Sequence, residues 1–444
     1  MKRNALLLSA LLLASVHAAG QNFDDYFEDK TLRLDYVFAG DSATQDIFFQ
    51  EASSTPRWAG RRHHLDKPLL GGNGKIIVRD KESGQVVYSN SFSTLFQEWQ
   101  STEEATTVRR AFENCFQVPY PKRPVEVTVS LIDVHGKVSS SLTHTVDPSD
   151  ILIRAKSSTV SFDYLHKGGD LEHSIDIAIL AEGYAESDRQ KFHEDAQRAC
   201  GFLLGHEPFK SKADKFNIVA VDAWSDDSGV SVPRRGQWKS TTASAHYDTF
   251  YSDRYLMTTN MQDIYDRLAG VPFEHIIVLV NTSTYGGGGI YNSVTVTTSD
   301  HPTSRQVLVH EFGHAFGGLG DEYFYDDQYS SMYPADTEPW EPNLTTLVDF
   351  NAKWADMLAK KTPIPTPAIS FDGYNPRNAM TFLRLDTKKQ QSLIRTVGVY
   401  EGGGYQSKGV YRPTMECRMK INEVEEFCPV CTRAIIKMID YYSE

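Results

Sequence analysis

The sequence is poor in cysteine, with five in 444 residues. A small extracellular domain that depends on disulfides carries many more, so a hydrophobic core must hold this fold together. Three of the five, Cys417, Cys428 and Cys431, lie close together in the sequence. A Cys-x-x-Cys pair occurs in redox motifs and as half of a zinc site, but no second such pair and no histidine pair accompanies this one. We therefore expect a structural disulfide between Cys417 and Cys428, and buried thiols at Cys115 and Cys200.

Positive charge is also scarce, because 45 Lys and Arg stand against 58 Asp and Glu, for a formal net charge of −13. Nucleic-acid recognition needs clustered Lys and Arg, and the basic runs at residues 61–64 and 234–235 are short. The composition thus excludes nucleic acid as the expected partner. After the first twenty residues, no apolar run reaches the ~18 residues of a membrane span, so no membrane-spanning helix is expected.

The first twenty residues, MKRNALLLSALLLASVHAAG, have the features of a targeting segment. A basic start precedes an apolar run of about ten residues and a small-residue exit at Ala18-Ala19-Gly20. The pattern predicts a signal peptide over residues 1–20 and export to the periplasm, the cell surface or the medium. An uncleaved anchor is the alternative.

The length of the chain indicates two domains. Residues 21–165 contain short stretches that alternate apolar and polar residues, including 31–40, 74–80, 85–92, 125–138 and 141–146. Such stretches predict an all-β, sandwich-like domain, with either an accessory or a purely structural role. We place the boundary within residues 166–174, where Gly168-Gly169 interrupts the pattern.

Residues 170–444 have a different sequence pattern, in which expected apolar strands alternate with expected helices. The expected strands are 175–184, 217–224 and 275–281, and the expected helices begin near Glu186 and span 257–270. This alternation predicts an α/β layer around a mainly parallel sheet.

A glycine run leads into a further expected strand, 290–298. Glycines without side chains let another backbone approach, so we expect an edge strand that pairs with an extended substrate. Its residues are Gly287, Gly288, Gly289, Ile290 and Tyr291. A flexible hairpin turn is the alternative.

The stretch VLVHEFGHAFGGLGDEYFY, residues 307–325, carries the clearest chemistry. His310 and His314 are four residues apart and so share one face of a helix. Glu311 lies about 100° around, where it can reach a water molecule held by a metal ion. This H-E-x-x-H arrangement is typical of a catalytic zinc site. The other interpretation is a chance match with histidines that only satisfy hydrogen bonds.

The ends of this helix can also be predicted. Thr303 and Gln306 have capping-box spacing, and Gly313 and Gly317 are expected to keep bulk off the metal-binding face. A turn at residues 317–320 ends the helix and can bring Asp321 or Glu322 beneath the histidines as a third ligand. A third ligand at Glu338 or Glu341 would need a second helix, against which the nearby prolines argue.

The segments HEFGHAFGGLGDEY, RPTMECRM and FCPVC resemble the IgA peptidase family of bacterial zinc metallopeptidases, which belongs to the metzincins. His310, Glu311, His314 and Gly317 match the extended metzincin motif, whereas Gly320 stands where its third histidine would be. The resemblance therefore implies Asp321 as third ligand in a longer loop. Glu322 is the alternative ligand, or else hydrogen-bonds a histidine or braces the loop. The implied fold is an α/β metzincin-like zinc peptidase domain over residues 170–444, preceded by the all-β domain.

The resemblance further implies a methionine turn beneath the metal, with Met419 favoured over Met415. For an oxyanion-stabilising group, Tyr323, Tyr411 and Arg412 remain open. The expected function is a secreted zinc-dependent endopeptidase with one Zn²⁺ per chain, acting on protein or peptide substrates, of which immunoglobulins are one candidate. The alternatives are a non-catalytic binding protein with a structural metal and a zinc exopeptidase. The sequence carries no signal for an oligomeric state.

Overall fold

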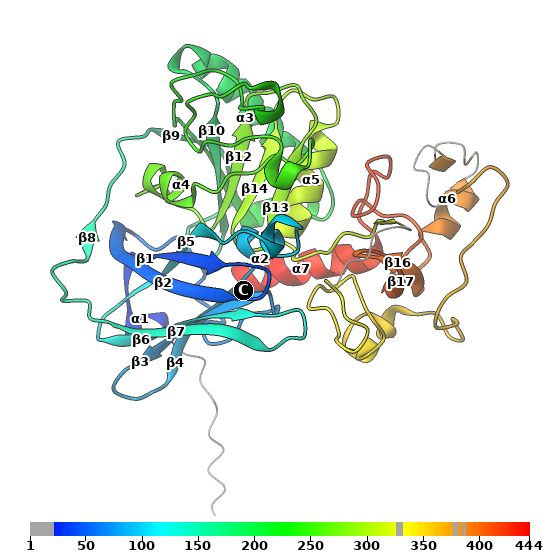
Figure 1. Ribbon diagram of the computed structural model, residues 1–444, viewed down its shortest axis with the longest axis horizontal. Helices are drawn as coiled ribbons and strands as arrows, with labels where there is room; N and C mark the ends of the chain where they lie inside the picture. The colour runs from blue at the N-terminus through cyan, green and yellow to red at the C-terminus, as the bar shows by residue number, and fades with distance from the viewer. Residues whose placement is uncertain (1–21, 326–331, 376–380, 383–384, 386–387) are drawn as a thin grey trace, which may run out of the picture.

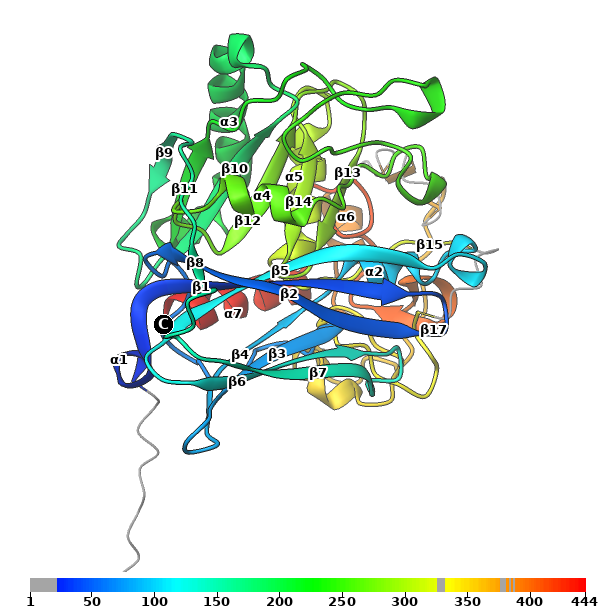
Figure 2. The same cartoon turned by 60° about the vertical axis from the view of Figure 1, so that its left-hand side comes forward.

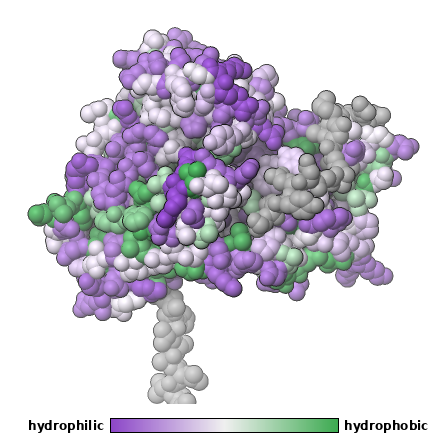
Figure 3. All heavy atoms as spheres, in the orientation of Figure 1, coloured by the Kyte–Doolittle hydropathy of each residue, from purple (hydrophilic) through white to green (hydrophobic). Residues whose placement is uncertain are grey.

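The computed structural model describes residues 22–325, 332–375, 381–382, 385 and 388–444. The predicted signal peptide lies outside these residues. Within them, no helix is both long and apolar enough to cross a membrane. In the space-filling view, hydrophilic residues cover most of one face, which is hollowed beside the centre (Figure 3).

Two sheets, antiparallel except for one short strand, form most of the N-terminal part (Figures 1 and 2). The first has the strand order β5 (Arg110–Pro121), β1 (Phe27–Gly40), β2 (Gln45–Pro56) and β8 (Arg154–Ala155), the last being parallel to β2. The second has the order β4 (Val86–Phe92), β3 (Gly74–Asp80), β6 (Val125–Ile132) and β7 (Val138–Val146). Leu34, Val78 and Val127 point into one core that both sheets share. The short helices α1 (Phe23–Tyr26) and α2 (Leu95–Trp99) complete this part.

A six-stranded sheet forms the middle of the chain. Its order is β13 (Gly287–Ile290), β14 (Val294–Thr298), β12 (His275–Val280), β10 (Ile175–Glu182), β11 (Phe216–Val221) and β9 (Phe162–Lys167). The four inner strands are parallel and the two edge strands antiparallel. Every residue of β10, β11 and β12 is buried, as expected for parallel strands covered on both faces. The prediction of a mainly parallel α/β layer is confirmed.

Helices cover both faces of this sheet (Figure 1). Helices α3 (Arg189–Leu204), α5 (Ser304–Ala315) and α7 (Pro429–Ser443) share one core with one face. Helix α4 (Met261–Arg267) packs on the other. A smaller region lies beside the six-stranded sheet, on the right in Figure 1. It contains helix α6 (Lys388–Ile394) and a sheet of the order β15 (Phe324–Tyr325), β17 (Tyr405–Arg412) and β16 (Tyr400–Gly403).

The end of α7 connects the two parts of the molecule. The Tyr441 hydroxyl donates a hydrogen bond to the Lys67 carbonyl at 3.0 Å, and the Tyr442 ring lies 5.1 Å from the ring of His275 in β12. The C-terminal helix therefore fixes the N-terminal part against the parallel sheet.

Buried His275 should make the fold sensitive to acid. Its ring packs against Phe312, Phe316 and Tyr442, and its Nε2 has no hydrogen-bond partner among the described residues. Burial lowers the pKa of His275 to about 3. Below the unfolded value of ~6.5, the unfolded chain therefore takes up a proton that the folded chain does not, so stability falls as pH drops.

We expect His275→Leu to remove this part of the acid sensitivity. Between pH 7 and pH 5, the wild type should lose about 2 kcal/mol more unfolding free energy than the variant, which follows from ~1.4 kcal/mol per pH unit. Urea unfolding at both pH values measures the difference. Equal losses in the two proteins would contradict the assignment.

Candidate metal centre

Three donor atoms converge where α5 ends. The Nε2 atoms of His310 and His314 are 3.1 Å apart. Asp321 Oδ1 lies 3.1 Å from the first and 3.2 Å from the second. The histidine side chains are 14% and 16% exposed and that of Asp321 is 7% exposed, so the cluster is reached from solvent on the histidine side.

Hydrogen bonds to the backbone hold both imidazoles in position. Nδ1 of His310 lies 3.1 Å from the Arg418 carbonyl oxygen, and Nδ1 of His314 lies 2.5 Å from that of Leu319. Carbonyl oxygens only accept hydrogen bonds, so each Nδ1 carries a proton, and the neutral tautomer of each ring then has its Nε2 lone pair free for a metal.

The donor set fits a zinc ion. Zinc binds His nitrogen and carboxylate oxygen at ~2.0–2.2 Å in tetrahedral geometry, which separates neighbouring donors by about 3.3 Å. The observed separations of 3.1–3.2 Å are close to this value. Asp321 Oδ1 has no other hydrogen-bond partner in the part of the chain that the structure describes, whereas Oδ2 accepts one from the Tyr405 hydroxyl at 2.5 Å. His310, His314 and Asp321 are therefore suited to holding zinc.

Electrostatics at the cluster favour a cation. Burial alone would raise the pKa of Asp321 and lower that of His314. The facing charges outweigh burial, so the pKa of Asp321 is far below its usual range and that of His314 rises to about 9. Without metal, the cluster compensates the carboxylate with a proton on an imidazole.

Glu311 stands beside this cluster without being part of it. Partial burial raises the pKa of its carboxyl, although the two histidines oppose the rise. A carboxylate with a raised pKa is a better proton acceptor near neutral pH.

The start of α5 differs from the prediction. Thr303 is the N-cap residue, but its side chain makes no capping hydrogen bond. Its hydroxyl lies 2.8 Å from His301 Nδ1 instead, so the predicted capping box with Gln306 is wrong. The preceding His301 competes for the hydroxyl.

Gly313 and Gly317 also have another role than predicted. A Cβ at Gly313 would lie 2.9 Å from Met419 Sδ, and one at Gly317 would lie 3.2 Å from Ile435 Cγ1 in α7. These glycines let the methionine and α7 approach α5, and do not clear the metal-binding face.

The loop after α5 carries Asp321. A Cβ at Gly320 would come within 2.5 Å of Leu344 Cδ1, so a side chain at the position of the metzincin third ligand would have to displace Leu344. Asn343 donates to the Gly320 carbonyl at 2.9 Å and accepts from its N–H at 2.8 Å. This bidentate contact fixes the loop that presents Asp321.

The two methionines occupy different environments. Met419 lies under α5 through its contact with Gly313, and its carbonyl accepts a hydrogen bond from the Glu322 N–H at 2.8 Å. Met415 belongs to a separate core with Tyr374 and Ile394. The geometry thus favours Met419 for the methionine turn.

The predicted disulfide between Cys417 and Cys428 is wrong. All five cysteines are free and buried. Cys417 Sγ accepts a hydrogen bond from the Cys428 N–H at 3.1 Å and lies 3.9 Å from Cys431 Sγ. The three sulfurs converge on Glu322 and do not pair with each other, and Glu322 contributes no donor atom to the histidine cluster.

The strand β13 is an edge strand of the sheet, as predicted, but its outer side is partly covered. Gly287 forms a bridge with Tyr255, and Tyr291 is buried against Trp340. A Cβ at Gly289 would lie 2.2 Å from the Glu311 carbonyl oxygen. The glycines therefore bring the edge strand against the helix that carries Glu311.

Residues from distant segments surround the cluster, and sequence reasoning missed them. The Tyr255 hydroxyl donates to Glu98 in α2 at 2.6 Å. Burial raises the pKa of Glu98 to about 7, with the charges of Asp321 and Glu311 adding to the rise. The N-terminal part thus contributes a carboxyl next to the metal centre. No local motif marks Glu98 or Tyr255.

The other expected candidates lie as follows. The Tyr323 ring packs against Tyr405 at 5.2 Å, and burial keeps the pKa of its phenol well above the usual range. Arg412 is engaged with the carbonyls of residues 401 and 402. Tyr411 pairs through its backbone with Thr345. Glu338 and Glu341 lie outside any helix and outside the donor cluster.

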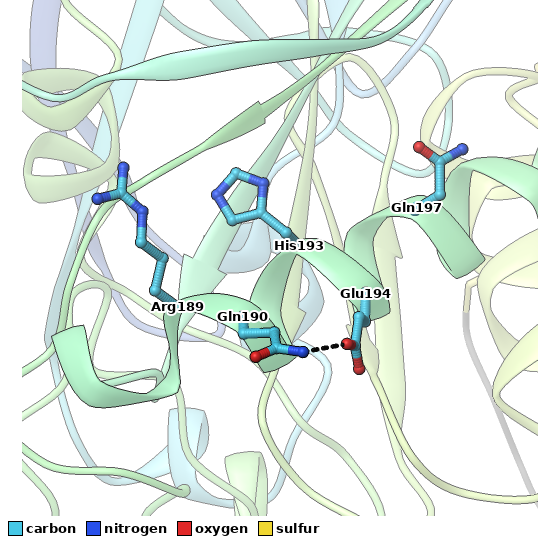
Figure 4. Close-up of a pocket in the computed structure, with 5 residues that line it drawn as sticks. All are labelled: Arg189, Gln190, His193, Glu194 and Gln197. Atoms are coloured by element: carbon cyan, nitrogen blue, oxygen red, sulfur yellow. Dashed lines mark hydrogen bonds between the residues drawn. The ribbon is translucent and has the colours of Figure 1, made fainter.

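A shallow hollow elsewhere on the surface has no part in this centre. It is lined by residues of α3 alone, and Gln190 donates to Glu194 across it at 2.9 Å (Figure 4). No metal-cluster residue lines it.

Comparisons with known families cover both parts of the chain. The family model described as IgA Peptidase M64 matches residues 164–439. The model described as Peptidase M64 N-terminus matches residues 22–143. No curated protein matches the chain.

Proposed function

The chain belongs to the IgA Peptidase M64 family, and from this premise we propose that it is an exported zinc-dependent endopeptidase. The observation that carries the proposal is the triangle of His310, His314 and Asp321 donors beside Glu311. Three protein donors leave a coordination position open, as catalytic zinc sites do and structural sites do not.

Different residues of the chain have different roles in peptide hydrolysis. His310, His314 and Asp321 hold the zinc, which when bound lowers the pKa of a water toward ~7 and polarises the scissile carbonyl. The Glu311 carboxylate takes the proton from the attacking water and passes it to the leaving amine nitrogen. The Tyr323 phenol is protonated at neutral pH and interacts electrostatically with Asp321 and Glu311, which supports it among the three candidates as the donor to the developing oxyanion.

The substrate would bind in extended form. The strand β13 packs on α5, so a peptide lying along it would pass next to Glu311. Because Gly287 already bridges Tyr255 and the Tyr291 carbonyl already accepts a hydrogen bond from the Ser93 N–H, pairing with a substrate would be confined to the residues between them. Tyr255 and Glu98 would lie beside a peptide bound there and so affect the choice of substrate.

Other parts of the proposal rest on the sequence and the arrangement of elements. The first twenty residues support export by a signal peptide. The helix bearing His310 and His314, the carboxylate in the following loop and Met419 beneath it support a metzincin-like arrangement of the site. Immunoglobulins remain one candidate substrate.

A chelation experiment with a mixed peptide library tests the function. We expect fragments from internal cleavage, loss of more than about 100-fold in rate with a chelator, and recovery when Zn²⁺ is added back. Sequencing the products by mass spectrometry gives the readout. Release of single amino acids would instead indicate an exopeptidase, and a zinc-loaded protein that cleaves nothing would indicate the binding protein.

A further inference from the structure

A second group of potential metal ligands lies behind the candidate catalytic centre. Glu322, Cys417, Cys428 and Cys431 each place one donor atom within 4.8 Å of all the others. All four residues are fully buried. They come from three separate segments: the loop after α5, the turn that contains Met419, and the first turn of α7.

We propose that these four residues form a second, closed zinc site with a structural role. Three thiolates and one carboxylate complete a tetrahedral shell without an open position, which is the arrangement of structural zinc. Thiolate sulfur favours zinc over magnesium and calcium, for which oxygen donors are preferred. On binding, each of the three thiols loses its proton to solvent and forms a bond to the metal through sulfur.

The sulfur positions fit this site better than a disulfide. Zinc–sulfur bonds of ~2.3 Å in a tetrahedral shell separate two sulfurs by about 3.8 Å. Cys417 Sγ and Cys431 Sγ are 3.9 Å apart, nearly twice the ~2.05 Å of a disulfide bond. The Cys428 N–H donates to Cys417 Sγ at 3.1 Å, a contact that stabilises negative charge on the sulfur.

Glu322 gives an independent indication of a cation. Its side chain is fully buried, Oε1 lies 3.1 Å from Cys431 Sγ, and Oε2 has no hydrogen-bond partner among the described residues. A buried carboxylate without a full set of partners is costly unless a cation compensates it. Asn343 donates to Oε1 at 3.0 Å and so holds the carboxylate toward the sulfurs.

Nearby positive charge would balance the loaded site. Three thiolates, one carboxylate and Zn²⁺ carry a net charge of about −2. Arg412 and Lys420 both interact electrostatically with Glu322. Cys428 is the N-cap of the fifteen-residue helix α7, whose N-terminal dipole also favours negative charge.

The site would act on the catalytic centre by positioning. Glu322 directly follows Asp321, and the Glu322 N–H donates a hydrogen bond to the carbonyl of Met419. Cys417 lies two residues before Met419. A metal at the second site would therefore fix the Asp321 loop and the methionine turn together against α7.

Counting zinc in the full-length protein tests the proposal. We expect two zinc ions per chain in the wild type, one in the His310→Ala/His314→Ala variant and one in Cys431→Ser. The matched control Cys200→Ser removes a buried thiol in α3 outside the cluster and should keep two. Native mass spectrometry and elemental analysis measure the counts, independently of any peptidase activity.

If Cys431→Ser does not fold, the His310→Ala/His314→Ala variant still tests the proposal. X-ray absorption at its remaining zinc should show three sulfur ligands at ~2.3 Å. One zinc in the wild type and none in the histidine variant would overturn the second site. So would an intact mass lower by two hydrogens, with two of the three thiols blocked, because that result identifies a disulfide.

Discussion

Replacing Glu311 by Gln is expected to lower kcat by about 10³-fold while the protein keeps its zinc. The amide is nearly the same size as the carboxylate but cannot take a proton from the attacking water. None of the three donor atoms belongs to Glu311, so metal binding should be unchanged. Steady-state kinetics on a peptide substrate and zinc content, measured on the same samples, give both quantities.

A control at another glutamate separates the chemistry from the loss of charge. Glu194 lies on α3 in the hollow of Figure 4, outside the metal cluster. Glu194→Gln should retain wild-type kcat and zinc content. If Glu311→Gln keeps its zinc and loses less than tenfold in kcat, Glu311 is not the general base.

The elements with strong local patterns could be predicted from the sequence. The apolar runs of β10, β11 and β12 are buried on both faces, and their composition reflects this. The strand β2 was not predicted, because seven of its last eight residues are polar, small or proline and none of its first eight residues is fully buried. Its place in the sheet depends on pairing with β1.

The candidate site likewise contains residues that the sequence could place and residues that it could not. His310, Glu311 and His314 could be placed relative to one another because one helix carries them all. Asp321 needed the family resemblance, since a loop sets its position. Glu98 was out of reach, because it approaches the site only when the N-terminal part packs on the α/β part.

The cysteines show why closeness in sequence is a poor guide to pairing. The sequence predicts a disulfide between Cys417 and Cys428 because the cysteines lie close together and no second Cys-x-x-Cys pair or histidine pair accompanies them. The structure instead directs their sulfurs and that of Cys431 toward Glu322, which is far away in the sequence. A shared partner at that distance leaves no local signal.

Replacing Asp321 by Ala is expected to weaken zinc binding at the histidine site by more than about 100-fold. The change removes one of three protein ligands and the only negative charge among them. A loss of a hydrogen bond to a ligand typically costs 10–100-fold in affinity, so loss of the ligand should cost more. Competition with a chromophoric chelator measures the affinity, and kcat/KM should fall in parallel at limiting zinc.

Tyr405→Phe is expected to have a smaller effect than Asp321→Ala and so provides an intermediate variant for comparison. It removes only the hydroxyl that donates to Asp321 Oδ2, so the carboxylate stays but loses its orientation. We expect a loss of about 10–100-fold in zinc affinity, between the wild type and Asp321→Ala. If Asp321→Ala bound zinc at the histidine site as tightly as the wild type, the third ligand would have to be another residue. If that residue were Glu322, its side chain would have to turn away from the cysteines, and the sulfur cluster would lose its carboxylate.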